Sequence, residues 1–267
     1  KKPELVIKKI IRSSISDLIC KGVKPKYYFI SGSGNKKSFS KLNLSKISKS
    51  LNEEQKKYKI FLSGGDTVFS NKLSFSITSI GFAKNIIYRN KAKVGDDIYV
   101  SGNLGDSYFG LLALQKKINI NNSSRNYFIK QYYKPNIQLI LADKLSKFAN
   151  TSIDISDGLL ADMDKMINNQ ELTYRLYLKD IPVSKVFHKE LTKKKLKKIN
   201  YISKGDDYQI LFTASKLKRR IIRHMSSSFK IKMTKIGIIQ KANTKSSIIG
   251  FKNEEISLKN KGFLHQF

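Results

Sequence analysis

The stretch that decides the fold runs from residue 153 to residue 164 and reads Ile153-Asp-Ile-Ser-Asp-Gly-Leu-Leu-Ala-Asp-Met-Asp164. Its start alternates apolar and acidic residues, which predicts the end of a buried strand, and the residues after Gly158 predict a helix. Asp154 then lies between two isoleucines, where a carboxylate is costly unless it is paired or coordinates a metal. The segment predicts an α/β protein of the mixed α+β kind, with a metal or an ion-pair partner at Asp154.

The two residues that follow the strand allow two interpretations. Ser156 has the side chain of a helix N-cap, and Asp157 would then lie in the first helical turn, where a negative charge is favourable. Alternatively, both residues contact a ligand. Capping explains this pair well, but it does not explain Asp154. Asp162 and Asp164 fall later on the helix, and we expect them to be solvated.

Acidic residues are few, and many of them adjoin glycine. Five of the 13 aspartates neighbour a glycine directly: Asp66, Asp96, Asp106, Asp157 and Asp206. Glycine lets backbone N–H groups approach phosphate oxygens, and Asp supplies the hard oxygen ligands that Mg²⁺ prefers. Asp-Gly pairs are also ordinary turn formers. Five such pairs at predicted strand ends favour a phosphate and metal site.

The remaining periodicity predicts alternating strands and helices. We expect strands over 60–63, 73–83, 97–101, 151–155 and 232–239, and helices over 44–57, 107–117, 136–149 and 216–225. Gly64-Gly-Asp66 should form a turn after the first of these strands. The residues 102–106 resemble the phosphate-binding start of a helix, and Ser16-Asp17 echoes Ser156-Asp157 as a second helix start.

The chain is strongly basic, with 52 Lys and Arg residues against 20 Asp and Glu and a net charge of +32. Such a charge is typical of proteins that bind nucleic acids, since cations neutralise phosphates and release counterions. However, 45 of the 52 are lysine, whereas arginine is suited to bidentate phosphate and base contacts. The excess therefore indicates compositional drift, and we expect no specific nucleic-acid partner.

Length and rare residues set further limits. The 267 residues suffice for one large domain or two modest ones. A single cysteine, Cys20, excludes a disulfide framework and indicates a reducing compartment, and we expect it to be a small buried residue. No apolar run approaches the length of a membrane span. These features predict a cytoplasmic protein without a membrane partner.

Seven segments, taken together and in order, resemble thiamine-monophosphate kinase, a family of the aminoimidazole-ribonucleotide-synthetase-like ATPases. They are Ser16-Asp-Leu18 with Gly22 and Pro25, Gly64-Gly-Asp-Thr67, Arg89-Asn-Lys-Ala-Lys-Val-Gly-Asp96, Val100-Ser-Gly102 with Leu104-Gly-Asp106, residues 153–159, Gly205-Asp-Asp-Tyr208, and Gly262-Phe-Leu-His265. The resemblance spans residues 12–267 and implies a two-domain fold of that superfamily.

The resemblance also implies an activity and a site. It implies that ATP phosphorylates thiamine monophosphate to thiamine diphosphate by direct in-line transfer, with Mg²⁺ as cofactor and without a histidine base. Carried over position by position, the Mg²⁺ ligands are Asp17, Asp66, Asp154 and Asp157. The ATP contacts are Gly65, Asp66, Arg89 and Ser156, and the thiamine contacts are Asp206 and Phe263.

Two departures from the family pattern accompany the resemblance. The family has Glu where this chain has Asp206, so the carboxylate reach toward the pyrimidine is shorter. The family's preceding segment, with an acidic metal loop and the first strands, has no match before Lys1. We therefore expect an incomplete N-terminal domain over 1–84, a C-terminal α/β domain over 85–267, a homodimer, and a sheet edge left unpaired.

Three alternatives remain at this point. A sister enzyme, such as aminoimidazole ribonucleotide synthetase or selenophosphate synthetase, shares the Gly-Gly-Asp and Ser-Asp-Gly segments, although Gly205-Asp-Asp-Tyr208 and Gly262-Phe-Leu-His265 favour the thiamine enzyme. A basic nucleic-acid-binding protein would show binding that weakens steeply with salt. A remnant that binds ligands without turning them over is the third.

Overall fold

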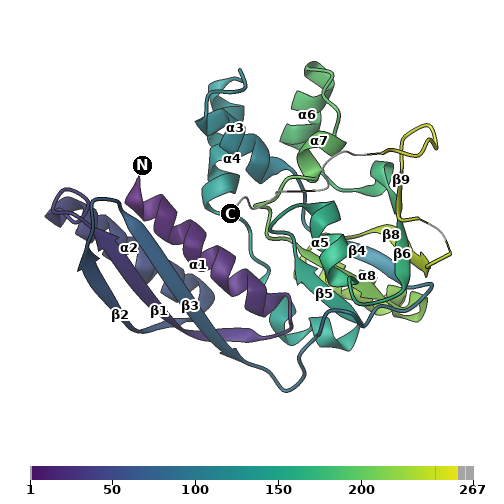
Figure 1. Ribbon diagram of the computed structural model, residues 1–267, viewed down its shortest axis with the longest axis horizontal. Coiled ribbons are helices and arrows are strands. Elements are labelled where there is room, and N and C mark those ends of the chain that lie inside the picture. Colours follow the sequence, from purple (N-terminus) through teal and green to yellow (C-terminus); the bar gives the residue numbers. More distant parts are fainter. Residues whose placement is uncertain (1, 244, 258–261, 263–267) are drawn as a thin grey trace.

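The computed structural model describes residues 2–243, 245–257 and 262, and it arranges them around two separate β-sheets (Figure 1). The smaller sheet contains β1 (Lys24–Gly34), β2 (Phe61–Phe69) and β3 (Ser74–Phe82). The larger sheet contains β4 (Asp97–Ser101), β5 (Thr151–Asp154), β6 (Leu172–Tyr177), β7 (Ile210–Ala214), β8 (Met233–Lys241) and β9 (Ser247–Ile249). The α-helices are α1 (Pro3–Ile19), α2 (Lys41–Tyr58), α3 (Asp106–Leu114), α4 (Asn122–Tyr133), α5 (Leu159–Met166), α6 (Lys185–Lys193), α7 (Ile199–Ile202) and α8 (Arg219–Phe229). The mixed α/β class is confirmed, whereas the domain division at residue 84 stays a prediction.

Helix α1 joins the small sheet to the rest of the molecule. Its isoleucines at 7, 11, 15 and 19 recur every fourth residue, so they form one apolar stripe, and all four are fully buried. The stripe belongs to a core that also contains Tyr28 of β1, Ile47 of α2 and Phe212 of β7. One continuous core therefore holds α1 against both sheets.

The small sheet has strand order β2-β1-β3, with β1 parallel to β2 and antiparallel to β3. Tyr28 points toward the helices and is buried, whereas its neighbour Phe29 is exposed on the opposite face. Every residue of β2 is exposed. Among the described residues, neither β2 nor β3 pairs on its outer side. The prediction that a missing segment leaves a sheet edge unpaired stays a prediction, because any open sheet of a single chain has two outer edges.

The large sheet has strand order β5-β7-β4-β8-β6-β9, and only the β6–β9 pair is parallel. All five residues of β4 are buried because both faces of the sheet are covered. Tyr99 packs in the core shared with α1, while Ile98 and Val100 pack on the opposite face beside α5. In the described part of the chain, no helix is both long and apolar enough to cross a bilayer.

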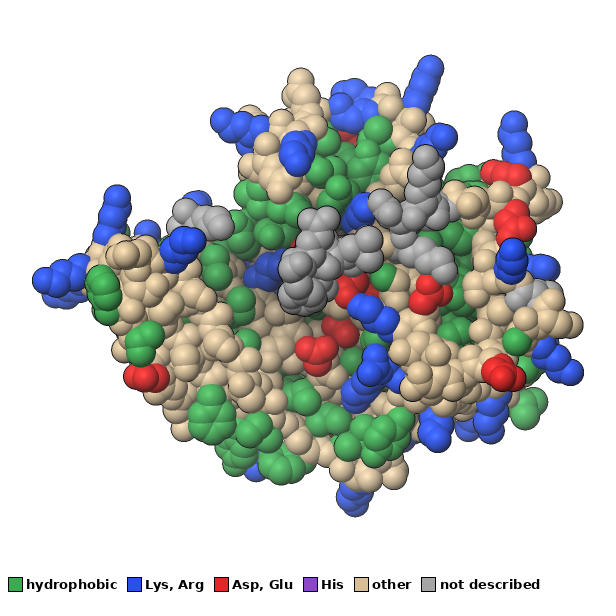
Figure 2. All heavy atoms as spheres, in the orientation of Figure 1, with side chains coloured by type: hydrophobic (Ala, Val, Ile, Leu, Met, Phe, Trp, Pro, Cys, Tyr) green, Lys and Arg blue, Asp and Glu red, His purple; other side chains and the backbone are tan. Residues whose placement is uncertain are grey.

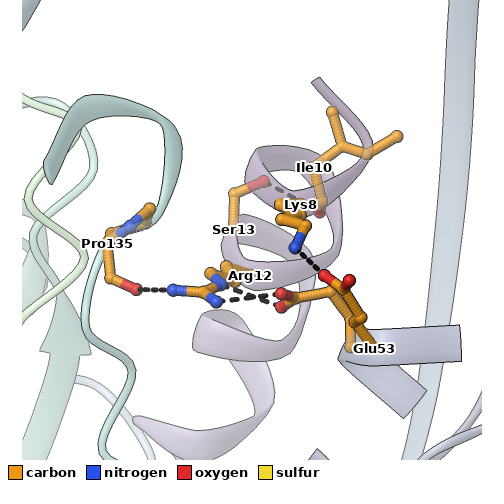
Figure 3. A network of polar contacts seen from close by, with 7 residues as sticks. Lys8, Ile10, Arg12, Ser13, Glu53 and Pro135 are labelled. Atoms are coloured by element: carbon orange, nitrogen blue, oxygen red, sulfur yellow. Dashed lines mark hydrogen bonds and ion pairs between the residues drawn. The ribbon is translucent and has the colours of Figure 1, made fainter. Parts of the chain in front are cut away.

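A buried ion pair fastens α1 to α2. Arg12 donates hydrogen bonds to both carboxylate oxygens of Glu54, at 2.8 and 2.9 Å, and a third to the carbonyl oxygen of Pro135 at 3.0 Å. Figure 3 shows Arg12 reaching from α1 toward Pro135, with the Lys8–Glu53 ion pair beside it. The Arg12 network connects three segments that are far apart in the sequence.

The helix predicted over 136–149 is wrong. The segment forms two short 3₁₀ turns, Leu139–Asp143 and Leu145–Lys147. Side chains from elsewhere in the chain hold the start of this segment, since the Pro135 carbonyl accepts from Arg12 and the Asn136 carbonyl accepts from Gln209. The sequence analysis also missed α4, whose start is marked by the Asn121 side chain accepting from Ser124 N at 2.8 Å.

Two predicted turn positions lie inside regular elements. Gly64-Gly-Asp66 is not a turn, because β2 continues through it and pairs with β1 as far as Phe69. A Cβ at Gly65 would lie 1.9 Å from the Ile30 carbonyl oxygen, so the close approach of the two strands requires glycine there. Ser16-Asp17 is not a helix start but lies in the last turn of α1. In both cases a periodic pattern continues through the polar motif.

The start of α3 is not an open phosphate site as predicted. The Asp207 carboxylate accepts hydrogen bonds from Gly105 N at 2.7 Å and Ser107 N at 3.3 Å. Burial raises the pKa of Asp207, which is only 4% exposed. An internal carboxylate therefore occupies the place where a phosphate oxygen would bind.

Asp106 should make stability depend on pH. Ser184 and Tyr127 hydroxyls donate to its carboxylate at 2.7 and 2.8 Å, yet burial raises its pKa to about 6. Because this pKa exceeds the unfolded value, folding disfavours the ionised form, and stability is lost as the pH rises through about 4 to 6. We expect Asp106→Asn to gain about 2 kcal/mol relative to the parent between pH 4 and pH 7, measured by urea unfolding. Equal differences at both pH values would contradict this.

Candidate active site

The last turn of α1 meets the end of strand β5 at a buried carboxylate. The Ser16 hydroxyl donates a hydrogen bond to Oδ2 of Asp154 at 2.8 Å, and Cys20 Sγ lies 3.9 Å from Oδ1. Asp154 is 3% exposed and Cys20 is 1% exposed. The predictions of a buried acid and of a small buried cysteine are both confirmed.

Asp17 and Asp154 form a pair of mutually repelling carboxylates. Burial, followed by the negative charge of Asp17, raises the pKa of Asp154 to about 6. Partial removal from water raises the pKa of Asp17, and the charge of Lys21 offsets part of that rise. A cation between the two carboxylates would remove their repulsion, so their charge and oxygen donors fit Mg²⁺.

Arg89 lies in the same region as this pair. Burial lowers the pKa of Lys21, the nearby carboxylates and Cys20 counteract this, and the positive charge of Arg89 lowers it further. The residues on either side of Arg89 are anchored: the Tyr88 carbonyl accepts from Thr151 Oγ1, and Asn90 N donates to the Met166 carbonyl, both at 2.8 Å. The site thus has cations as well as carboxylates, and the ATP contact of Arg89 stays a prediction.

The loop after β5 is shaped by an acid that was expected to be solvated. Asp162 is fully buried, and its Oδ2 accepts from Asp157 N at 2.8 Å and from Gly158 N at 3.1 Å. Helix α5 begins at Leu159, so Ser156 is not its N-cap. The carboxylate of Asp157 forms an ion pair with Lys165. Asp162 stabilises the loop because it accepts hydrogen bonds from two backbone N–H groups that would otherwise be buried without a partner.

A second loop, residues 205–208, lies directly on this one. Asp206 N donates to the Ser156 carbonyl at 2.9 Å, and Tyr208 N donates to the Ile155 carbonyl at 2.8 Å. A Cβ on Gly205 would lie 1.8 Å from the Ser156 carbonyl oxygen, which explains glycine at that position. The structure therefore brings Ser156, Asp157 and Asp206 together.

Gly65 and Asp66 do not join this group. The parallel register pairs Asp66 with Ser31 of β1. Asp66 and Ser31 therefore lie on the exposed face of the small sheet, opposite α1. Figure 1 places β2 at the far end of the molecule from β5. The Asp66 side chain accepts a hydrogen bond from Thr67 N at 2.7 Å. Within this chain, Asp66 therefore does not lie beside Asp17 and Asp154.

The other residue predicted to contact thiamine, Phe263, lies outside the described residues. Its neighbour Gly262 is buried, and a Cβ there would lie 2.4 Å from Ala161 Cβ and 2.8 Å from the Asp157 carbonyl oxygen. Figure 2 shows acidic side chains gathered in the middle of this face, between the two halves of the molecule and beside Lys and Arg side chains.

The described residues of this chain supply an incomplete set of metal ligands. In the part of the chain that the structure describes, no group of three His, Cys, Asp or Glu side chains is arranged to hold a metal ion. Of the four predicted ligands, Asp17 and Asp154 are close enough to repel each other, Asp157 pairs with Lys165, and Asp66 lies on the exposed face of the small sheet. The first two fit a divalent cation, whereas the roles of the others stay predictions.

Sequence reasoning missed three residues beside Asp206. Lys9 of α1 forms an ion pair with Asp206 at 2.8 Å, and its ammonium lies over the Tyr132 ring. The Tyr208 hydroxyl donates to the same carboxylate at 3.1 Å. Tyr208 was visible in its motif, but Lys9 is one of 45 lysines and Tyr132 belongs to the helix that was missed.

Comparison with known proteins identifies the family. Residues 1–83 match the family model described as AIR synthase related protein, N-terminal domain. Thiamine-monophosphate kinase of Buchnera aphidicola subsp. Acyrthosiphon pisum (strain APS) is 34% identical over 98% of this chain and 81% of its own length. The crystal structure of thiamine monophosphate kinase from Aquifex aeolicus matches with a TM-score of 0.82, 26% identity and coverage of 96% of this chain and 83% of that one.

A further solved structure is that of a complex with two ligands. AaThiL complexed with AMPPCP and TMP matches with a TM-score of 0.84 and 25% identity, covering 99% of this chain and 82% of that one. The fold is thus that of the aminoimidazole-ribonucleotide-synthetase-like proteins, as the resemblance implied. On the identity and coverage of these relatives, the chain belongs to the thiamine-monophosphate kinase family.

Proposed function

We propose that this chain transfers the γ-phosphoryl group of ATP to the phosphate of thiamine monophosphate, giving thiamine diphosphate and ADP. The observation that carries the proposal is the meeting of α1 with the loops after β5 and before β7, which gathers Asp17, Asp154, Ser156 and Asp206. A similar protein was solved with AMPPCP and TMP, which are an ATP analogue and the acceptor of this reaction.

The reaction needs positioning more than acid–base chemistry. An oxygen of the acceptor phosphate attacks the γ-phosphorus while the bond from that phosphorus to the β,γ-bridging oxygen breaks in line. The attacking oxygen is already ionised, so no side chain has to remove a proton. Arg89 would bind phosphate oxygens of ATP, and Ser156 would orient the nucleotide from the rigid loop over Asp162.

Mg²⁺ would neutralise the two phosphate groups, whose charges otherwise repel each other. Asp17 and Asp154 would hold it, since they supply two oxygen donors that lack a strong cationic partner at short range. Asp157 would join them by releasing Lys165. These carboxylates are held by α1, β5 and the loop over Asp162, so little has to be ordered when the ion binds.

We propose a homodimer in which a second copy covers the exposed small sheet. Strand β2 exposes Phe61, Leu62, Val68 and Phe69, and Phe82 of β3 is 62% exposed. Exposed apolar strands with free edges are usually covered by a partner. Gly65 and Asp66 lie on this sheet, so their contacts with ATP and Mg²⁺ require that the nucleotide reaches the covered face.

The substrate end of the site is assigned to Asp206 and Phe263. Asp206 contacts the loop that carries Ser156 and Asp157, which supports its place beside the acceptor. Family membership favours this reaction over those of the sister synthetases and over nucleic-acid binding. The cytoplasmic location stays a prediction.

A turnover assay tests the proposed function. The purified chain, incubated with thiamine monophosphate, ATP and MgCl₂, should release thiamine diphosphate and ADP in equal amounts, measured by chromatography. Omission of Mg²⁺ should stop the reaction because the phosphate charges are then not neutralised. Unphosphorylated thiamine serves as the control acceptor and should not react. ADP released without thiamine diphosphate, or neither product at any Mg²⁺ concentration, would contradict the proposal.

A further inference from the structure

Helix α1 contributes residues to both ends of the site. Ser16 lies seven residues after Lys9, which is about two helical turns, so the two side chains lie on the same face, and Asp17 lies about 100° further around the helix. Ser16 contacts Asp154 and Lys9 contacts Asp206. At 1.5 Å per residue, Lys9 lies about 12 Å along the helix from Asp17. The same helix therefore contacts the two ends of the site.

Lys9 is surrounded by an acid and two aromatic rings. Its Nζ lies 2.8 Å from Oδ1 of Asp206, 3.5 Å from the centre of the Tyr132 ring and 5.8 Å from that of Tyr208. Burial lowers the pKa of Lys9, and the negative charge of Asp206 counteracts this. Withdrawing an ammonium group from water is costly, and the carboxylate and the ring faces offset that cost.

Both the backbone and the side chain of Asp206 are held by contacts. Its backbone has a left-handed φ of 72° and is hydrogen-bonded to the Ser156 carbonyl. Its Oδ1 forms the ion pair with Lys9 and accepts a hydrogen bond from the Tyr208 hydroxyl. Among the described residues, Oδ2 has no hydrogen-bond or ion-pair partner. The side chain is 30% exposed. Among the described residues, Oδ2 is thus the carboxylate oxygen that remains available as an acceptor next to the site loop.

We propose that Lys9 is a positioning residue for substrate binding, which holds Asp206 so that its second oxygen accepts a hydrogen bond from the heterocyclic end of thiamine monophosphate. The proposal rests on the proposed function. Lys9 lies far from Asp17, so it should affect the acceptor and not ATP.

The test compares five variants of the full chain. Lys9→Met keeps the apolar stem and removes the charge, and Lys9→Arg keeps the charge. Lys8→Met is the matched control, because Lys8 is the adjacent lysine of α1 and pairs with Glu53 away from the site. Asp206→Asn is made alone and together with Lys9→Met. Calorimetry gives the Kd of thiamine monophosphate, and steady-state kinetics separate KM for each substrate from kcat.

We expect Lys9→Met to raise the Kd and KM for thiamine monophosphate about tenfold, because Asp206 loses the largely buried cation of its ion pair. KM for ATP and kcat should stay within about twofold, because transition-state contacts are not removed. Lys9→Arg should recover part of the affinity, and Lys8→Met should resemble the parent. The double variant should be no weaker than Asp206→Asn, since both changes act through one carboxylate.

Several results would overturn the proposal. An unchanged Kd in Lys9→Met would do so, as would equal losses for ATP and thiamine monophosphate that follow a lower melting temperature, or effects that multiply in the double variant. If the parent binds thiamine monophosphate without turning it over, the Kd comparison still decides the role of Lys9 while the proposed function fails. If the parent does not bind it, both fail.

Discussion

Replacing Asp154 with asparagine should lower kcat for thiamine diphosphate formation by about 100-fold or more while leaving the chain folded. The amide keeps the shape of the side chain and an acceptor for the Ser16 hydroxyl, which donates at 2.8 Å in the parent. It lacks the charge that would hold Mg²⁺ beside the phosphates. Turnover is measured at saturating ATP, with MgCl₂ varied over a wide range.

The same substitution should make the metal-free chain more stable. The raised pKa of Asp154, to about 6, shows that folding disfavours its ionised form. Removing the charge at pH 7 should therefore increase the free energy of unfolding by about 1 to 3 kcal/mol, measured with urea in a chelating buffer. Asp143→Asn is the control, because Asp143 is exposed and the substitution removes its surface ion pair with Lys24, in which the charged atoms are 4.0 Å apart. Near-parental turnover in Asp154→Asn would remove Asp154 from the metal site.

Replacing Arg12 with methionine should destabilise the fold by about 3 to 5 kcal/mol. The substitution leaves the Glu54 carboxylate, which is 1% exposed, without its bidentate partner, and it leaves the Pro135 carbonyl without a donor. An uncompensated buried charge costs far more than an intact pair contributes. Urea unfolding at pH 7 measures the loss.

Two further variants separate charge from packing in this network. In Arg12→Met combined with Glu54→Gln, part of the lost stability should return, because no buried charge is left unpaired. Lys8→Met should change stability little, since its partner Glu53 is exposed. If Arg12→Met alone loses no more stability than Lys8→Met, the buried pair does not hold α1 to α2.

The sequence was most informative where structure depends on neighbouring residues. The strands predicted over 97–101 and 151–155 alternate apolar and polar residues, and they occur as β4 (Asp97–Ser101) and β5 (Thr151–Asp154). The buried acid at Asp154 was recognised because isoleucines flank it in a strand. Such features follow from local periodicity, which needs no knowledge of distant contacts.

The predictions for the start of α3 and for residues 136–149 were wrong because contacts with residues far away in the chain determine these structures. Asp207 occupies the start of α3 from a position 102 residues away in the chain, and Arg12 takes the Pro135 carbonyl from 123 residues away. No local pattern shows that a carboxylate already occupies a helix start, or that distant side chains hold the start of a segment with a helical pattern. Lys9 was missed for the same reason, since its partner Asp206 lies on the other half of the molecule.

The polar face of α1 has a consequence for substrate choice. A helix is stiff along its axis, so the separation between Asp17 and Lys9 is set by its fixed rise per residue and not by adaptable loops. If Lys9 positions the heterocycle end and Asp17 the phosphate end, the site selects its acceptor by length. Analogues with altered rings of the same span should then be accepted more readily than analogues whose phosphate is attached through a longer or shorter side chain.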